Sequence, residues 1–241
     1  MESTPSSAVR IGDASEAKVL SLVLSGPKRL LMLVINYCPL LHAILIGVTL
    51  SIAWAPWQWR LLAGLGLLYL LPPLAARVMR AVAPLREGRI PVGTRHFFSW
   101  WALFNLQVLF SRLPALEEVL RLVPGLYTLW LRLWGARIGR LTYWAAGLRI
   151  LDRSLVCIGD DVIFGAGVRL NPHVLRRNDR GELELILATV TVGDRVVVGG
   201  YSLLTAGTVI APDECTRAFL ISPPFSKWKN GTRIAKTDAT P

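Results

Sequence analysis

The chain has 241 residues, 53% hydrophobic and 18% charged, with a formal net charge of +11 at pH 7. A soluble domain has about 25% charged residues, so the composition predicts a membrane segment and argues against a wholly soluble protein. The positive charge suits anionic lipid headgroups or an anionic cosubstrate such as coenzyme A (CoA), and no aromatic-basic motif points to nucleic acid. The odd number of cysteines, three, predicts reduced thiols in a cytosol-facing protein.

The first part of the chain predicts a flexible segment followed by a transmembrane helical hairpin. Residues 1–27 begin with small, polar residues of mixed charge and are expected to be flexible. The hairpin is predicted over residues 28–96, and its first arm, 30–54, has 25 residues without a formal charge. Pro39 is expected to kink this arm. Asn36 and His42 are expected to contact a neighbouring helix or to lie near the interface, the alternative being polar groups that mark a pathway through the membrane.

The returning arm of the hairpin is shorter. Residues 61–76 are uncharged, and Pro72-Pro73 can end this helix early, so a tilted or re-entrant hairpin stays open beside a full crossing. Tryptophans between the two arms have the composition of a membrane-interface belt. Arginines gather after the second arm, and the positive-inside rule therefore predicts that both termini face the cytosol.

Residues 97–134 are expected to form amphipathic helices that lie in the membrane interface and join the hairpin to the C-terminal half of the chain. Residues 97–111 are rich in aromatic side chains and lie between Arg95 and Arg112. After Pro114, apolar residues recur at helical spacing with charged residues on the opposite face.

Residues 135–225 follow a different rule. Aliphatic or aromatic residues recur every six positions, and a small residue follows several of them. A period of six matches neither a helix nor an ordinary strand, and it predicts a parallel β-helix with one flat face per hexapeptide. The expected inward residues are Ile158, Phe164, Leu170, Val192, Val198, Leu204 and Ile210. The predicted fold class is therefore mixed, a helical hairpin with interfacial helices and then a short β-helix.

The period is interrupted once. Leu170 and Val192 are 22 positions apart, which is not a multiple of six, so an excursion of roughly residues 175–185 leaves the coil. Its arginines and acidic residues predict a solvated loop. His173, the one histidine of the repeat region, precedes it, and a titratable imidazole at the root of such a loop is a candidate catalytic group.

These motifs resemble the hexapeptide-repeat acyltransferases, especially the galactoside and maltose O-acetyltransferase branch. The resemblance rests on Ile150-Leu151-Asp152, Ile158-Gly159-Asp160, His173 and the second repeat run from Val190, and it covers about residues 135–225. Looser similarity extends to the membrane-embedded C-terminal part of polylysine-synthetase-type nonribosomal peptide synthetases. The family implies a left-handed β-helix, homotrimers with sites between adjacent coils, and direct transfer without an acyl-enzyme.

The resemblance also implies roles for individual residues. His173 stands in the position of the general base, the alternative being a structural histidine. Asp152 lies on the acceptor side, where it either binds an acceptor hydroxyl or orients the imidazole; capping a turn with its own backbone is the competing interpretation. Asn171 is a second acceptor-side candidate.

Small residues are the predicted binding positions for acyl-CoA, the expected cosubstrate. Backbone amides at Gly199-Gly200 and Ala206-Gly207 are open to a pantetheine arm or an oxyanion. The galactoside branch has serine at the position of Gly200, so Ser202 is considered as a substitute hydroxyl. Lys227 and Lys229, in a predicted basic tail of residues 226–241, complete the candidate CoA-binding set.

The predicted function is a membrane-anchored acyltransferase at the inner membrane with its catalytic domain facing the cytoplasm. It moves an acetyl or longer acyl group from CoA, or from a carrier protein, to a hydroxyl or amine of an amphiphilic or saccharide acceptor. The alternative is a non-catalytic, membrane-anchored trimeric scaffold. A γ-type carbonic anhydrase needs three zinc histidines at its subunit interfaces, which a single histidine in the coil region cannot supply, so no metal site is expected.

Overall fold

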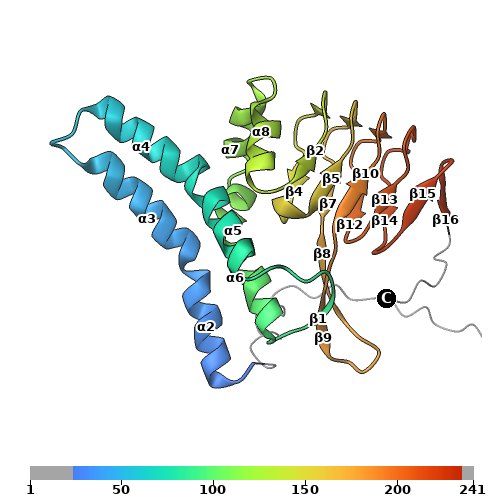
Figure 1. Cartoon of the computed structure of the whole chain (residues 1–241), viewed down its shortest axis with the longest axis horizontal. Helices are drawn as coiled ribbons and strands as arrows, with labels where there is room; N and C mark the ends of the chain where they lie inside the picture. The colour runs from blue at the N-terminus through green and yellow to red at the C-terminus, as the bar shows by residue number, and fades with distance from the viewer. Residues whose placement is uncertain (1–23, 235–241) are drawn as a thin grey trace, which may run out of the picture.

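The computed structural model describes residues 24–234, which form a helical arm followed by a coil of short parallel strands (Figure 1). The predicted flexible segment therefore lies largely outside the described residues. The arm consists of α2 (Gly26–Asn36), α3 (Cys38–Ser51), α4 (Trp57–Tyr69) and α5 (Leu71–Val82). Helices followed by a parallel-strand region confirm the mixed fold class.

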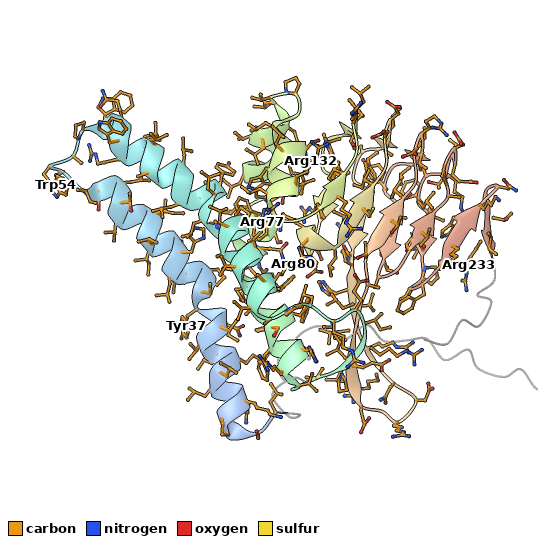
Figure 2. All side chains as sticks on the ribbon, in the orientation of Figure 1. Tyr37, Trp54, Arg77, Arg80, Arg132 and Arg233 are labelled. Carbon is orange, nitrogen blue, oxygen red and sulfur yellow. The ribbon has the colours of Figure 1, made fainter. Side chains whose placement is uncertain are left out.

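The arm has the features expected of a membrane hairpin. Gly26–Ser51 and Trp57–Val82 are each long and apolar enough to cross a membrane, with mean hydropathies of 2.1 and 1.7. Trp54 lies at the tip between the two arms, far from the coil, and is 88% exposed (Figure 2). The arginines Arg77 and Arg80 lie at the opposite end, on α5, beside the rest of the protein (Figure 2).

Three details of the arm bear on the expectations from sequence. The helix breaks at Tyr37, next to Pro39, which confirms the kink. Trp101 Nε1 donates to Asn36 Oδ1 at 2.8 Å, and His42 Nε2 lies 2.9 Å from the Leu67 carbonyl oxygen, so both polar side chains do contact neighbouring helices. Pro72-Pro73 does not end the second arm, because both prolines lie in the first turn of α5, where a missing amide costs no hydrogen bond.

Three further helices connect the arm to the coil. They are α6 (Arg95–Arg112), α7 (Ala115–Arg121) and α8 (Leu126–Leu133). The prediction that α6 lies in the membrane interface overlooked protein contacts, since its buried face carries Phe97, Trp100, Leu103 and Phe110. α6 packs on the arm through α2, α3 and α5, and on the coil through this buried face. An aromatic helix between two protein layers has the same composition as one that faces lipid.

The coil is a parallel β-helix with three faces. The first face stacks β2 (Arg137–Ile138), β5 (Val156–Ile158), β10 (Val190–Val192), β13 (Val209–Ile210) and β15 (Lys227–Lys229). The second stacks β3 (Tyr143–Trp144), β6 (Ile163–Phe164) and β11 (Val197–Val198). The third stacks β4 (Arg149–Ile150), β7 (Arg169–Asn171), β12 (Leu203–Thr205) and β14 (Ile221–Ser222).

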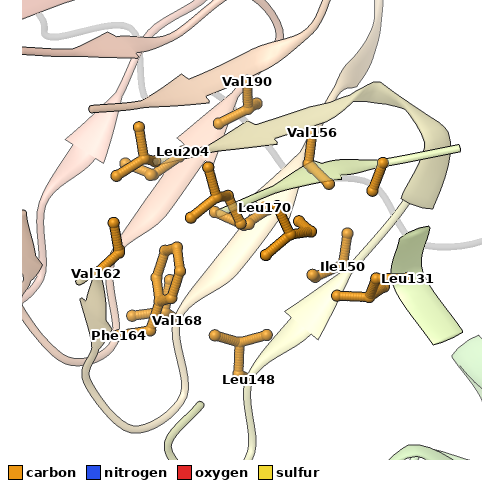
Figure 3. Close-up of a cluster of buried hydrophobic side chains, with 14 of the residues drawn as sticks. Leu131, Leu148, Ile150, Val156, Val162, Phe164, Val168, Leu170, Val190 and Leu204 are labelled. Carbon is orange, nitrogen blue, oxygen red and sulfur yellow. The ribbon is translucent and has the colours of Figure 1, made fainter. Parts of the chain in front are cut away.

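The register of these strands stacks the predicted hexad residues in columns. Ile158 pairs with Val192, Phe164 with Val198, and Leu170 with Leu204. All are buried, together with Val162, Val168, Leu148 and Ile150 (Figure 3). The corners are tight: a Cβ on Gly165 would lie 2.5 Å from the amide nitrogen of Gly200 on the next coil. The expectations of inward hexads and of small residues at corners are confirmed.

Two expectations about the coil were wrong. The excursion at 175–185 is a β-hairpin, β8 (His173–Arg177) and β9 (Leu183–Leu187), joined by β1 (Gly88–Pro91) into an antiparallel sheet. Its second strand is buried rather than solvated, because Leu185 and Leu187 face α6 and β1. The coil also continues past residue 225, since β15 pairs in parallel with β13 and β16 (Thr232–Ile234) closes the edge.

Candidate functional site

His173 and Asp152 meet at one corner of the coil. Asp152 follows β4 at the end of the third face, and His173 begins β8 just after β7, the next strand of that face. One turn of the coil therefore brings residues 21 positions apart into contact, and His173 Nδ1 is hydrogen-bonded to Asp152 Oδ2. Asp152 has a left-handed backbone conformation (φ 47°) at the corner that follows β4.

Helix α6 covers this pair with aromatic side chains. Trp100 Nε1 donates to the second carboxylate oxygen, Asp152 Oδ1, at 2.8 Å. The His173 ring lies edge-on between Trp100 and Phe104, with ring centroids at 4.9 and 5.3 Å. The spacing of four positions places both rings on one side of the helix. Sequence reasoning missed these two residues, since their aromatic helix was interpreted as facing lipid.

The environment prepares the imidazole to accept a proton. Asp152 is 3% exposed, so its charge acts in a medium of low polarity. Burial lowers the pKa of His173, but the charge of Asp152 and its hydrogen bond raise it by more, so the pKa lies above its usual value of 6.5. His173 Nε2 has no hydrogen-bond partner in residues 24–234 and is not sealed from solvent, so it is open to a substrate.

A buried charge network lies directly behind the pair. Arg153, 1% exposed, forms an ion pair with Glu117 on α7, and its backbone amide donates to Gln107 Oε1 on α6 at 2.8 Å. Glu117 also accepts from Tyr127 at 2.5 Å and pairs with Arg121 at 3.2 Å. Burial and the charge of Glu117 raise the pKa of the Tyr127 hydroxyl, which therefore stays protonated as a donor. The network holds the backbone next to Asp152 and ties it to two helices.

A cavity of about 130 Å³ lies beside the pair, because Leu151 and Arg153, the chain neighbours of Asp152, line it. Asn171, a predicted acceptor-side residue, lines it, two positions before His173. The side chains that share this lining come from the end of α6, the start of α7 and the third face, namely Phe110, Ser111, Pro114, Glu117, Leu148, Arg149, Ile150, Leu151, Arg153 and Arg169. The structure thus brings Asp152 and His173 into contact, whereas Asn171 lines an adjoining cavity whose lining includes neither residue of the pair.

The predicted CoA-binding glycines lie at two different corners of the coil. Ala206-Gly207 lie at the corner of His173, where the Gly207 amide donates to the Ala188 carbonyl oxygen at 3.2 Å and a Cβ on Gly207 would meet the Phe225 ring at 2.5 Å. Gly199-Gly200 lie at the other edge of the third face. Within one chain, Gly199 and Gly200 therefore lie away from the imidazole of His173.

Three other candidates also lie apart from the pair. The buried hydroxyl of Ser202 donates to the Gly199 carbonyl oxygen at 2.6 Å, so its hydrogen is not available to an oxyanion. Lys227 and Lys229 are exposed on β15, the last parallel strand of the first face. The basic pair thus belongs to the far end of the coil.

No family model and no curated protein matches this sequence. Among solved structures, the chain is similar to a hexapeptide-repeat-containing acetyltransferase from Vibrio cholerae O1 biovar eltor, complexed with acetyl coenzyme A. The identity is 18%, the match covers 51% of this chain and 82% of that chain, and the TM-score is 0.37. A second structure of a hexapeptide-repeat-containing acetyltransferase, from Vibrio cholerae, is 16% identical over 53% of this chain and 90% of that chain, with a TM-score of 0.34.

Proposed function

We propose that this protein is a membrane-anchored acyltransferase that uses His173 as general base. The observation that carries the proposal is the pair of buried Asp152 and partly buried His173, whose Nε2 has no partner in residues 24–234 and lies at a corner of a parallel β-helix. A carboxylate that orients Nδ1 and leaves Nε2 open is the arrangement that proton abstraction requires.

The proposed reaction is a direct transfer from an acyl-CoA thioester to an acceptor hydroxyl or amine. Nε2 of His173 takes the proton from the acceptor while the acceptor oxygen or nitrogen attacks the thioester carbonyl carbon. The tetrahedral intermediate then breaks the carbon–sulfur bond, and the CoA thiolate takes the proton back from the imidazolium. Asp152 stabilises the imidazolium, and Trp100 holds the carboxylate in place.

We propose that Gly199 and Gly200 serve the active site of a neighbouring copy in a trimer of left-handed coils. Gly200 and its amide lie at the edge of the third face away from His173, and this amide donates no hydrogen bond within residues 24–234. Next to it, Tyr201 and Phe219 are stacked at 5.4 Å and largely exposed, as is Ile221. Exposed aromatic and aliphatic side chains at an edge suit contact with a second coil.

The anchoring part of the proposal rests on the helical arm. None of the most apolar window of Gly26–Ser51 is buried, and the leucines of this helix are exposed. Leu122, Val123 and Leu129 on the α7–α8 side are also exposed and apolar. A bilayer covers such surfaces, and the positive-inside rule then puts the coil in the cytoplasm, where acyl-CoA is found.

Release of free thiol from acetyl-CoA, and from longer acyl-CoA, tests the proposal on the full chain in nanodiscs. A panel of hydroxyl and amine acceptors should give acceptor-dependent release, and His173→Ala should lower it by about 10²-fold or more. His96→Ala, which changes an exposed histidine of α6, is the matched control and should retain activity. Equal rates for the wild type and His173→Ala would refute the assignment, and trimers without any transfer would favour the scaffold.

A further inference from the structure

Two arginines on the outer side of the third face have no counter-charge. Arg149 on β4 and Arg169 on β7 are direct partners in the parallel register, and both side chains are exposed. Among residues 24–234, no carboxylate pairs with either guanidinium and no oxygen accepts a hydrogen bond from them. Like charges at paired positions of a sheet are unfavourable, so this place attracts an anion.

We propose that Arg149 and Arg169 bind a phosphate group of an amphiphilic acceptor, and that this subsite positions the acceptor for His173. The inference rests on the proposed acyl transfer. Two neighbouring guanidiniums present flat arrays of donors that match the oxygens of a phosphate.

The subsite is continuous with the catalytic corner. Arg169, Asn171 and His173 alternate along the chain from β7 into β8, so Arg169 and Asn171 share the outer side of the strand, which leads directly to His173. Side chains on one side of a strand follow at about 7 Å. A phosphate at the arginines therefore leaves room for an acceptor hydroxyl or amine to reach the imidazole past Asn171.

The surroundings of the arginines favour an amphiphile over a free anion. Both line the 130 Å³ cavity next to the catalytic pair, which Phe110, Pro114 and Leu151 make partly apolar. Both also line a second, more open cavity of about 450 Å³, where Tyr201 and Ile221 belong to the proposed contact with a neighbouring coil. The apolar wall of the first cavity beside two cations suits a molecule with a phosphate and hydrocarbon parts.

Charge balance inside the first cavity supports the same conclusion. Glu117 is the acidic residue of that lining, and its two oxygens are already used by Arg153, Arg121 and Tyr127. Its charge is thus neutralised locally and cannot serve the exposed pair. Arg149 and Arg169 keep a charge with no partner in residues 24–234, and this charge attracts an anionic ligand.

The test is a binding measurement that does not depend on turnover. Isothermal titration of n-octyl phosphate into the full chain in nanodiscs should show saturable binding beyond the partition into empty nanodiscs, and octanol should show partition alone. The double variant Arg149→Gln/Arg169→Gln should weaken this binding by about tenfold or more, since charge-assisted hydrogen bonds contribute at least about 1.5 kcal/mol. Arg140→Gln removes an exposed arginine that lines neither cavity and should leave binding within about twofold.

The remaining measurements distinguish an amphiphilic phosphate from inorganic phosphate, and the binding proposal from the catalytic proposal. Inorganic phosphate should bind more weakly than octyl phosphate; equal affinity would overturn the amphiphile. His173→Ala should bind octyl phosphate normally while losing acyl transfer. A wild-type protein that binds octyl phosphate but transfers no acyl group would count against the catalytic proposal alone. The inference fails if the double variant, with an unchanged melting temperature, binds octyl phosphate as the wild type does. It also fails if the double variant loses acetyl-CoA binding instead, because the arginines would then serve the donor. Arg169→Lys, which keeps the charge, gives a second measure and should fall between the wild type and the double variant.

Discussion

Replacing Asp152 with asparagine should reverse the proton arrangement of His173 without removing a contact. Trp100 Nε1 is a donor only, and it points at Oδ1 at 2.8 Å. The amide oxygen of the asparagine will therefore face Trp100, and its NH₂ group will face His173 Nδ1. His173 is then forced to carry its proton on Nε2, the nitrogen that should accept the proton of the acceptor. The rate of acyl transfer should fall by about 10²–10⁴-fold.

The same substitution should lower the pKa of His173. In the wild type, the charge and hydrogen bond of Asp152 raise this pKa against the effect of burial. Without the charge, burial prevails and the pKa should fall below 6.5. Titration of the His173 ring by nuclear magnetic resonance measures both values, and the nitrogen shifts identify the tautomer. An asparagine variant with an unchanged His173 pKa would refute the reasoning.

The pH dependence of stability should also change sign. A raised pKa in the folded protein gives stability that is fully present below pH 6.5 and is lost as the pH rises through the folded pKa. In the asparagine variant the folded pKa is lower, so the contribution is present above pH 6.5 and is lost as the pH falls. Thermal unfolding in detergent at several pH values, with His173→Asn as the variant without this ionisation, measures the difference. Parallel pH curves for all three proteins would contradict the prediction.

Three further substitutions test the structure that supports the site. Arg153→Met should destabilise the protein by about 3 kcal/mol, because buried Glu117 loses one of its two ion pairs and keeps only Arg121. Adding Glu117→Gln should recover part of the loss, and additive losses in thermal unfolding would argue against the pair. Gly165→Ala should cost about 1–3 kcal/mol through its clash with the next coil, whereas Gly66→Ala, with nothing within 4 Å, should not lower the melting temperature. Phe164→Ala, at a fully buried position in the coil, should lower the free energy of unfolding by about 3–5 kcal/mol. A shift in melting temperature as small as that of Gly66→Ala would show that the column of inward side chains at Phe164 does not stabilise the coil.

Helix α6 is the physical link between the helical arm and the site. Trp101 contacts Asn36 of the arm, and on the same helix Trp100 contacts Asp152. Gln107, two turns later, holds the backbone of Arg153. A displacement of the arm relative to the coil would therefore act on the hydrogen bonds that orient the catalytic pair.

The amino-acid sequence by itself determined the coil and the identity of its central residues. A period of six, with small residues at the corners, is compatible with stacked turns because each inward side chain must rest on the one below, as Phe164 rests under Val198. The long uncharged runs determined the helical arm in the same local way. His173 was identifiable because it stands at the one break in the period.

Only the tertiary structure decided how the catalytic pair is held. The contacts of Trp100 and Gln107 with Asp152 and Arg153 join residues about fifty positions apart in the chain, and no local pattern encodes which layer an aromatic helix faces. The hairpin at 173–187 likewise forms because β1, far earlier in the chain, completes its sheet. Side-chain periodicity reports which face of an element is buried, whereas the partner on that face is chosen by packing of the whole chain.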